Sequence, residues 1–200
     1  MGEYPLNEGW WTLPALLVLG YLSGSWLAAL WVCRLAGADD PRRAGSGNPG
    51  FSNVLRLHGK RLALTTLVLD AAKGMPAVWL SLMVGLPPWA QGMVGLAVML
   101  GHSYPCWYRF RGGKAVASAF GVLLMLTPGV ALACAAIWLL LAWRLRTAAV
   151  ASLISAAAAP LVSLWLAPDY LLVIIAFAAL VVLRHLLNIY RLRRGDELQL

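Results

Sequence analysis

Three polar segments of this chain combine residue types that could hold a phosphate group. The first runs Gly45-Ser46-Gly47-Asn48-Pro49-Gly50-Phe51-Ser52-Asn53-Val54-Leu55-Arg56. Its glycines let the backbone approach a ligand closely, and turns with exposed N–H groups form anion-binding nests. Ser46, Asn48 and Asn53 add hydrogen-bonding groups, and Arg56 adds a permanent charge. A flexible loop is the alternative. A Walker loop is excluded, because no Lys-Ser/Thr pair follows the glycines.

The second segment contains Gly101-His102 and, further on, Gly112-Gly113-Lys114 at the start of an apolar run. If that run is a helix, its first N–H groups and the positive end of its dipole favour an anion, and Lys114 adds a charge. The alternative is a basic loop without a ligand. His102 taken alone is more often a structural histidine.

The third segment begins at His185 and ends at Glu197. In a helix, His185 and Asn188 share one face, and Arg191 lies one step further along it. The alternative is a basic tail that touches anionic lipid.

The sequence shows no pattern typical of covalent or metal chemistry. No Ser-His-Asp or Cys-His set is evident, so we expect no covalent intermediate. Cys33, Cys106 and Cys134 are isolated, without metal-ligand spacing, and are typical of small packed apolar residues. We therefore expect neither a metal nor a cofactor.

The elements that carry these segments are those of a membrane protein. Hydrophobic residues make up 61% of the chain and charged residues 12%, a composition that excludes an ordinary soluble domain. Crossing a bilayer takes about 20 apolar residues. The chain divides into seven apolar runs, which predict an all-α, polytopic protein with seven transmembrane helices in one domain, residues 1–200: 11–33, 62–84, 89–108, 115–127, 130–143, 148–166 and 170–186. The fourth and fifth runs are short and could form one kinked helix.

The basic residues decide the topology. Of the sixteen Lys and Arg, all except Lys73 fall in 34–61, 109–114, 144–147 or the tail from 184. With seven spans, these segments share one side, and the other side receives Glu3, Glu8 and Asp169. By the positive-inside rule the N-terminus is outside and the C-terminus cytoplasmic, and merging the fourth and fifth runs is rejected. The net charge of +8 therefore indicates topology, and we expect no nucleic-acid partner.

Two charges inside the second span need a separate explanation. Asp70 and Lys73 stand at i and i+3, and charges within a bilayer are normally paired or functional. We predict a structural ion pair that braces the polar segments.

Taken together, the motifs resemble those of the bacterial acyl-phosphate:glycerol-3-phosphate acyltransferase family. The matching elements, in chain order, are Tyr21-Leu22-Ser23-Gly24-Ser25, Gly45 to Arg56, Asp70-Ala71-Ala72-Lys73-Gly74, Gly101-His102, Gly112-Gly113-Lys114, Ser152 and His185 to Glu197. Phe51-Ser52 replaces the family's Ala-Thr, Ala115 replaces a Gly, and Ala149 replaces a Ser. The likeness covers almost the whole chain.

The resemblance implies an enzyme of the bacterial inner membrane with its active site at the cytoplasmic face. Its substrates would be glycerol 3-phosphate and a long-chain acyl phosphate, its product lysophosphatidic acid, and its state a monomer in contact with membrane lipid. Arg56 and Lys114 would bind phosphate. The implied catalytic residues are Ser46, Arg56, Lys114, His185 and Asn188; further substrate-binding residues are Gly47, Asn48, Asn53, His102, Gly112, Gly113 and Ser152; structural support comes from Ser25, Asp70, Lys73, Arg191 and Glu197.

Two questions stay open at this point. The family resemblance implies direct transfer in which a substrate phosphate takes the proton, and His185 or His102 as general base is the competing version. A transporter for an organic phosphate or a lipid-binding scaffold would also contain apolar helices and basic loops. Because nearly every charge lies at one face, an enzyme is the better reading.

Overall fold

The computed structural model describes residues 11–200, and every regular element in that range is helical. Glu3 and Glu8, which the charge argument assigns to the outer side, lie outside the described residues. The elements are α1 (Thr12–Ser25), α2 (Ala28–Leu35), α3 (Phe51–His58), α4 (Lys60–Ala72), α5 (Met75–Met83), α6 (Pro88–Ser103), η1 (Cys106–Tyr108), α7 (Val116–Leu126), α8 (Pro128–Leu145), α9 (Ala148–Leu166), η2 (Pro168–Tyr170), α10 (Leu171–Arg184) and α11 (Leu186–Arg194).

Each apolar run corresponds to one helix or to a broken pair. The fourth and fifth runs are separate helices, α7 and α8, as predicted, with Thr127 between them. The first two runs are each interrupted, at Trp26-Leu27 and at Lys73-Gly74. Thr12–Leu35, Pro128–Leu145 and Ala148–Leu166 are long and apolar enough to cross a membrane. The bent pair Pro168–Arg184 and Leu186–Arg194 would add a fourth crossing.

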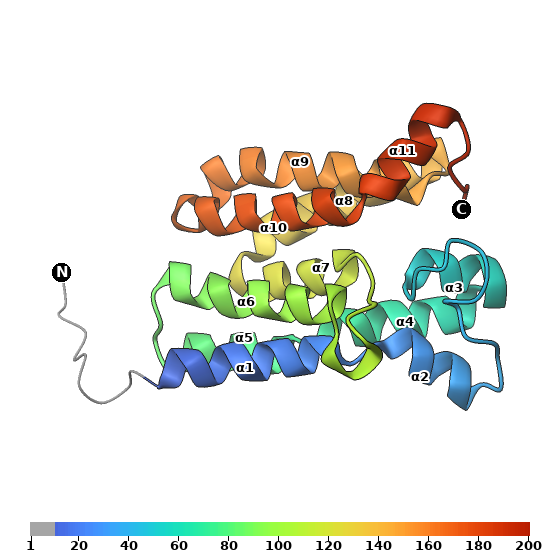
Figure 1. The fold of residues 1–200 in the computed structure, drawn as a ribbon. Coiled ribbons are helices and arrows are strands. Elements are labelled where there is room, and N and C mark those ends of the chain that lie inside the picture. Colours follow the sequence, from blue (N-terminus) through green and yellow to red (C-terminus); the bar gives the residue numbers. More distant parts are fainter. Residues whose placement is uncertain (1–10) are drawn as a thin grey trace.

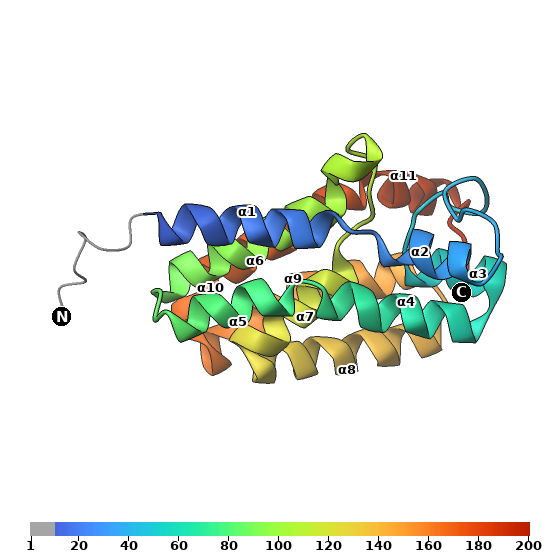
Figure 2. The same cartoon turned by 90° about the horizontal axis from the view of Figure 1, so that it is seen from below.

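The helices form an elongated bundle with two different ends (Figure 1). α8, α9 and α10 lie along one side of it and α1, α5 and α6 along the other, and Figure 2 shows their axes running in the same general direction. The α2–α3 and α8–α9 connections lie at the end marked by α3, α11 and the C-terminus, and the α6–α7 connection lies further in, beside the end of α1. The turns before α6 and before α10 lie at the opposite end.

The predicted ion pair is confirmed, and it joins the two helix breaks. Lys73 Nζ lies 2.9 Å from Asp70 Oδ1, with both side chains almost fully buried. The ammonium also donates to the Trp26 carbonyl, at 2.8 Å, and to His102 Nδ1, at 2.7 Å, so each of its three protons has an acceptor. Asp70 Oδ1 accepts from the Ala28 amide at 3.4 Å. A cation thus lies at the end of α1 and an anion at the start of α2, as their dipoles favour.

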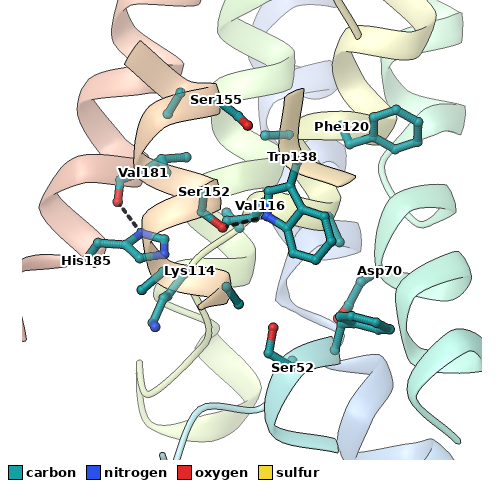
Figure 3. A pocket seen from close by; sticks show the side chains of 18 of the residues that line it. Ser52, Asp70, Lys114, Val116, Phe120, Trp138, Ser152, Ser155, Val181 and His185 are labelled. Carbon is teal, nitrogen blue, oxygen red and sulfur yellow. Dashed lines mark hydrogen bonds between the residues drawn. The ribbon is translucent and has the colours of Figure 1, made fainter. Parts of the chain in front are cut away.

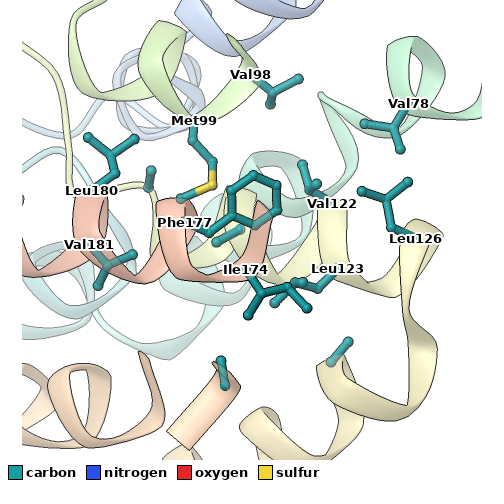
Figure 4. Packing of buried hydrophobic residues seen from close by; sticks show 14 of the residues in the cluster. Val78, Val98, Met99, Val122, Leu123, Leu126, Ile174, Phe177, Leu180 and Val181 are labelled. Atoms are coloured by element: carbon teal, nitrogen blue, oxygen red, sulfur yellow. The ribbon is translucent and has the colours of Figure 1, made fainter. Parts of the chain in front are cut away.

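The apolar core lies between α5, α6, α7 and α10, where Val98, Val122 and Phe177 meet (Figure 4). α1 packs closely on α6 because Gly24 leaves room for the backbone at Val98, which any larger residue would meet. Small residues at helix crossings are typical of membrane proteins. This rigid half of the bundle supports one wall of the cavity described next.

Candidate active site

One cavity of about 440 Å³ brings most of the predicted site residues together. Its polar end lies beside the basic connections, and an apolar arm extends between α7, α8, α9 and α10. The predicted residues that line the cavity are Ser46, Asn48, Asn53, Arg56, Asp70, His102, Lys114, Ser152, His185, Asn188 and Glu197. They come from the α2–α3 and η1–α7 connections, the α10–α11 junction, the C-terminal segment and helices α3, α4, α6, α9 and α11. Figure 3 shows several of them, among them Lys114, Ser152 and His185.

Asn53 organises the first loop from within. Its Nδ2 donates to the carbonyls of Pro41, at 2.7 Å, and Ala44, at 3.1 Å, and its Oδ1 accepts from the Ser46 amide at 2.9 Å. The side chain is fully buried. The Asn53 amide thus holds the loop backbone at Ser46, and because Asn53 also lines the cavity, its contact with substrate stays a prediction. Gly45 is left-handed, with φ +60°, and packs against this amide.

The Gly112-Gly113 turn is fastened from two sides. The Gly113 amide donates to the His102 carbonyl at 3.0 Å, so this N–H is not available to an anion. From the other side, Arg184 donates to the Gly113 carbonyl, at 3.0 Å, and to the Gly112 carbonyl, at 3.2 Å. The two glycines therefore position Lys114 and do not line the cavity themselves. His102 lines the cavity and supports the turn.

Lys114 reaches the cavity through an unusual backbone. The helix that follows it starts at Val116, and Ala115 before it is left-handed, with φ +58°. Partial burial lowers the pKa of Lys114 to about 8; Glu197 opposes this shift, and the cations of Arg56, Arg191 and Arg184 add to it. A cation in such a setting gains from an incoming phosphate, which supplies the missing counter-charge.

His185 and Asn188 occupy one face at the junction of α10 and α11, as predicted. His185 Nδ1 lies 2.8 Å from the Val181 carbonyl, which can only accept, so Nδ1 carries the proton and Nε2 is left as an acceptor. Asn188 Nδ2 donates to Glu197 Oε1 at 2.7 Å. Figure 3 shows His185 beside Lys114 at the polar end.

Ser152 lines the cavity from α9. Its hydrogen-bond partner, Trp138, was not among the predicted site residues. The indole N–H of Trp138 donates to Ser152 Oγ at 2.9 Å, so Trp138 fixes this hydroxyl (Figure 3). Trp138 in turn meets the ring of Phe51 edge-on, with centroids 6.2 Å apart.

Arg56 lies between the cavity and the last residues of the chain. Its Nε donates to the Gln199 carbonyl, and its terminal nitrogen donates to the Leu198 carbonyl at 3.2 Å. The Leu200 amide donates to the Arg146 carbonyl at 2.7 Å. The C-terminal segment thus completes one wall of the site. Burial lowers the pKa of Arg56, and Glu197 opposes that shift.

Several predicted residues lie outside the cavity lining. Ser25 bonds within α1, Oγ to the Tyr21 carbonyl at 2.8 Å, and Lys73 serves the ion pair. Gly47 is left-handed, with φ +70°, and shapes the loop. Arg191 accepts the Asp196 amide with its carbonyl at 2.9 Å, which helps to end α11. Arg184 was expected only as a topology charge, although it fastens the Gly112-Gly113 turn.

Comparison with known proteins assigns this arrangement to a family. The family model described as glycerol-3-phosphate acyltransferase matches residues 14–195. The chain belongs to the glycerol-3-phosphate acyltransferase family. Within it, the chain is 62% identical over 185 residues to the glycerol-3-phosphate acyltransferase of Chromohalobacter salexigens, covering 92% of this chain and 90% of that one. It is 42% identical over 186 residues to the enzyme of Idiomarina loihiensis, covering 92% and 95%.

A solved structure of a family member has the same fold. The chain is similar to the crystal structure of PlsY (YgiH), an integral membrane glycerol 3-phosphate acyltransferase, in its glycerol 3-phosphate form. The TM-score is 0.88 at 34% identity, and the match covers 94% of this chain and 96% of that one. The lysophosphatidic acid form of the same protein matches with a TM-score of 0.86. The family resemblance inferred from the motifs is confirmed.

Proposed function

We propose that this chain transfers a fatty acyl group from an acyl phosphate to the 1-hydroxyl of glycerol 3-phosphate, giving lysophosphatidic acid and inorganic phosphate. One observation carries the proposal. Two cationic side chains from separate parts of the chain, Arg56 of α3 and Lys114 before α7, line the same cavity as His185 and Asn188, and that cavity continues into an apolar arm. The two cations match the phosphate groups of the two substrates, and the apolar arm matches the acyl chain of the donor. The solved relatives bound to glycerol 3-phosphate and to lysophosphatidic acid support the substrate and the product.

The chemistry of each side chain indicates its role in the proposed reaction. Arg56 and Lys114 bind the phosphate groups and offset the negative charge that develops on the carbonyl oxygen and on the departing phosphate. Ser46 and Asn48 offer hydrogen bonds to phosphate or glycerol oxygens. His185 Nε2 accepts from a glycerol hydroxyl, and Asn188, held by Glu197, orients the same end of the substrate.

The reaction needs no covalent enzyme intermediate. The 1-hydroxyl oxygen attacks the acyl carbonyl carbon, the bond from that carbon to the phosphate oxygen breaks, and the phosphate leaves. The hydroxyl proton passes either to a substrate phosphate or to His185 Nε2. Holding both substrates in line lowers the barrier by several kcal/mol through positioning.

A His185→Ala variant separates the two proton acceptors. If a substrate phosphate takes the proton, single turnover persists at a reduced rate and the acidic limb of the pH–rate profile is unchanged. If chemistry stops while both substrates still bind, His185 is the base. We favour His185 over His102 as the competing base, because His102 Nδ1 accepts from Lys73 and its ring packs on the Gly113 backbone.

The same proposal includes a membrane topology. Seven crossings, α1–α2, α4–α5 and α6 to α10, place every basic connection on the cytoplasmic side of the bacterial inner membrane, with the N-terminus outside and the enzyme a monomer of one domain. α7 has 11 residues, about 16 Å of helix, and spans only part of the bilayer. Labelling a single cysteine at Asp169 or at Arg146, in a variant without the three native cysteines, tests the sidedness. Impermeant reagent should reach 169, and not 146, in intact cells.

The test of the function uses the purified protein with hexadecanoyl phosphate and radiolabelled glycerol 3-phosphate. We expect lysophosphatidic acid and one inorganic phosphate per turnover. Hexadecanoyl coenzyme A, with the same chain, is the matched control donor and should give no product. Product from the coenzyme A thioester alone would refute the acyl phosphate as donor. A protein that forms no lysophosphatidic acid with either donor would refute the function.

A further inference from the structure

Phe51 and Trp138 form an aromatic bridge across the cavity. Their ring centroids are 6.2 Å apart and the rings are inclined by 71°, an edge-to-face contact. Phe51 opens α3, which packs on α4, and Trp138 lies on α8, which packs on α9. The contact therefore joins two parts of the bundle that form opposite walls of the cavity, and both residues line it.

The bridge lies where the polar end of the cavity gives way to the apolar arm. Figure 3 shows Lys114 and His185 on one side of Trp138 and Phe120 on the other. The cavity lining also includes the apolar residues Leu123, Ile174 and Phe177. An acyl chain that runs from the polar end into the arm has to pass this indole. The bridge thus places two aromatic rings in the lining between the polar end and the arm.

Trp138 also connects the bridge to the chemistry. Its N–H donates to Ser152 Oγ at 2.9 Å, so this hydroxyl accepts from the indole and can turn its own proton toward an oxygen in the cavity. The position of the indole therefore determines both the width of the passage and the orientation of Ser152. The ring of Phe51 holds the indole from the opposite wall.

We propose that Phe51 is a specificity-determining residue, which through Trp138 limits the bulk of the acyl chain next to the reacting carbonyl. The Phe51 ring lines the cavity against Trp138 and occupies space that a smaller side chain would leave to the acyl chain. A straight acyl chain fits beside the bridge, and a chain with a methyl branch near its carboxyl end does not. The inference rests on the proposed function, because the acyl donor is its substrate.

The test compares two donors, hexadecanoyl phosphate and 3-methylhexadecanoyl phosphate, with each variant. Phe51→Ala should lower the preference for the straight donor, measured as the ratio of kcat/KM values, by about three- to tenfold, the factor that the loss of one aromatic pair corresponds to. The change should lie in KM for the donor, with KM for glycerol 3-phosphate unchanged. Phe51→Tyr keeps the ring and should keep the wild-type ratio.

Two further variants separate this role from a merely structural one. Trp138→Phe keeps a ring for Phe51 but removes the N–H that orients Ser152, so kcat should fall while the donor ratio changes less than in Phe51→Ala. Trp143→Ala removes an exposed tryptophan of the same helix and should leave the ratio unchanged.

An unchanged donor ratio in Phe51→Ala, with the protein folded, overturns the inference. If Phe51→Ala does not fold, Phe51→Leu fills the site without a ring, and an unchanged ratio in that variant overturns it equally. A wild-type protein inactive with both acyl phosphates refutes the proposed function instead. These two failures are therefore distinguishable.

Discussion

Replacing Arg184 by lysine should separate the charge of this side chain from its hydrogen bonds to the Gly112-Gly113 turn. The guanidinium donates to two carbonyls at once, at 3.0 and 3.2 Å, and lies 4.8 Å from the centroid of the Tyr104 ring. A lysine keeps the positive charge that orients the helix but reaches at most one of the two carbonyls. The Gly112-Gly113 turn then loses one hydrogen bond. Because Lys114 follows the turn directly, its position in the cavity should change.

The size of the effect follows from the hydrogen bond that is lost. A hydrogen bond from a charged donor contributes about 1.5–3 kcal/mol. If the loss appears entirely as misplacement of Lys114 in the transition state, kcat/KM for glycerol 3-phosphate falls roughly 10- to 150-fold. Arg184→Ala removes both hydrogen bonds and the contact with Tyr104, so its kcat/KM for glycerol 3-phosphate should be lower than that of Arg184→Lys.

The assay is initial-rate kinetics of detergent-purified protein, with thermal unfolding measured in parallel. Arg193→Ala is the matched control, because it removes an exposed arginine from α11, nine residues further along. It should keep kcat/KM within about twofold. Wild-type kcat/KM in Arg184→Lys, or an equal loss in Arg184→Lys and Arg193→Ala, would refute the positioning role.

Three further predictions concern the site and its support. Because the pKa of Lys114 is about 8, kcat/KM for glycerol 3-phosphate should fall above pH 8, approaching tenfold per pH unit, and Lys114→Arg should abolish this limb; a limb that survives in the variant belongs to another group. Asp70→Asn leaves a buried ammonium without its counter-charge and should lower the free energy of unfolding by about 3–5 kcal/mol, seen as a lower Tm in detergent; an unchanged Tm would mean that the pair is dispensable. At Ala115, with φ +58°, glycine should change that free energy by less than about 1 kcal/mol, whereas valine should cost more than about 2 kcal/mol; equal Tm values for the two variants would contradict the strain.

The sequence predicts the helices better than their interruptions. Length and hydropathy locate each apolar run, since a bilayer core demands about 20 apolar residues. They do not reveal the breaks at Trp26-Leu27 and Lys73-Gly74, because neither contains a proline and both are compensated by groups elsewhere in the chain. The i, i+3 spacing of Asp70 and Lys73 predicted an ion pair in the second span, but it did not predict that the helices break there.

For the site, residue type was informative about which side chains meet and less so about what each one does. Asn53, Gly112 and Gly113 were expected to bind substrate. In the structure Asn53 bonds to the backbone of its own loop, and the two glycines bond to the Arg184 side chain and to the His102 carbonyl. Arg184 looked like one more basic residue at a helix end, because its partners are carbonyls more than 70 positions away, which no local pattern encodes. The contact between Phe51 and Trp138 was not predicted either, because these residues are far apart in the sequence and no local pattern encodes their contact.

The ion pair at the helix breaks has a consequence for how the chain enters the membrane. An aspartate or a lysine near the centre of an isolated membrane helix costs about 2.5–3.5 kcal/mol on insertion. The α4–α5 segment carries both, and their partners, the carbonyl of Trp26 and the amide of Ala28, belong to the α1–α2 segment, which is made first. If α4–α5 crosses the bilayer as proposed above, its two charges gain these partners once the α1–α2 segment is in place. The proposed topology then implies that the N-terminal half inserts in chain order, and that the contact supporting the finished site favours this order.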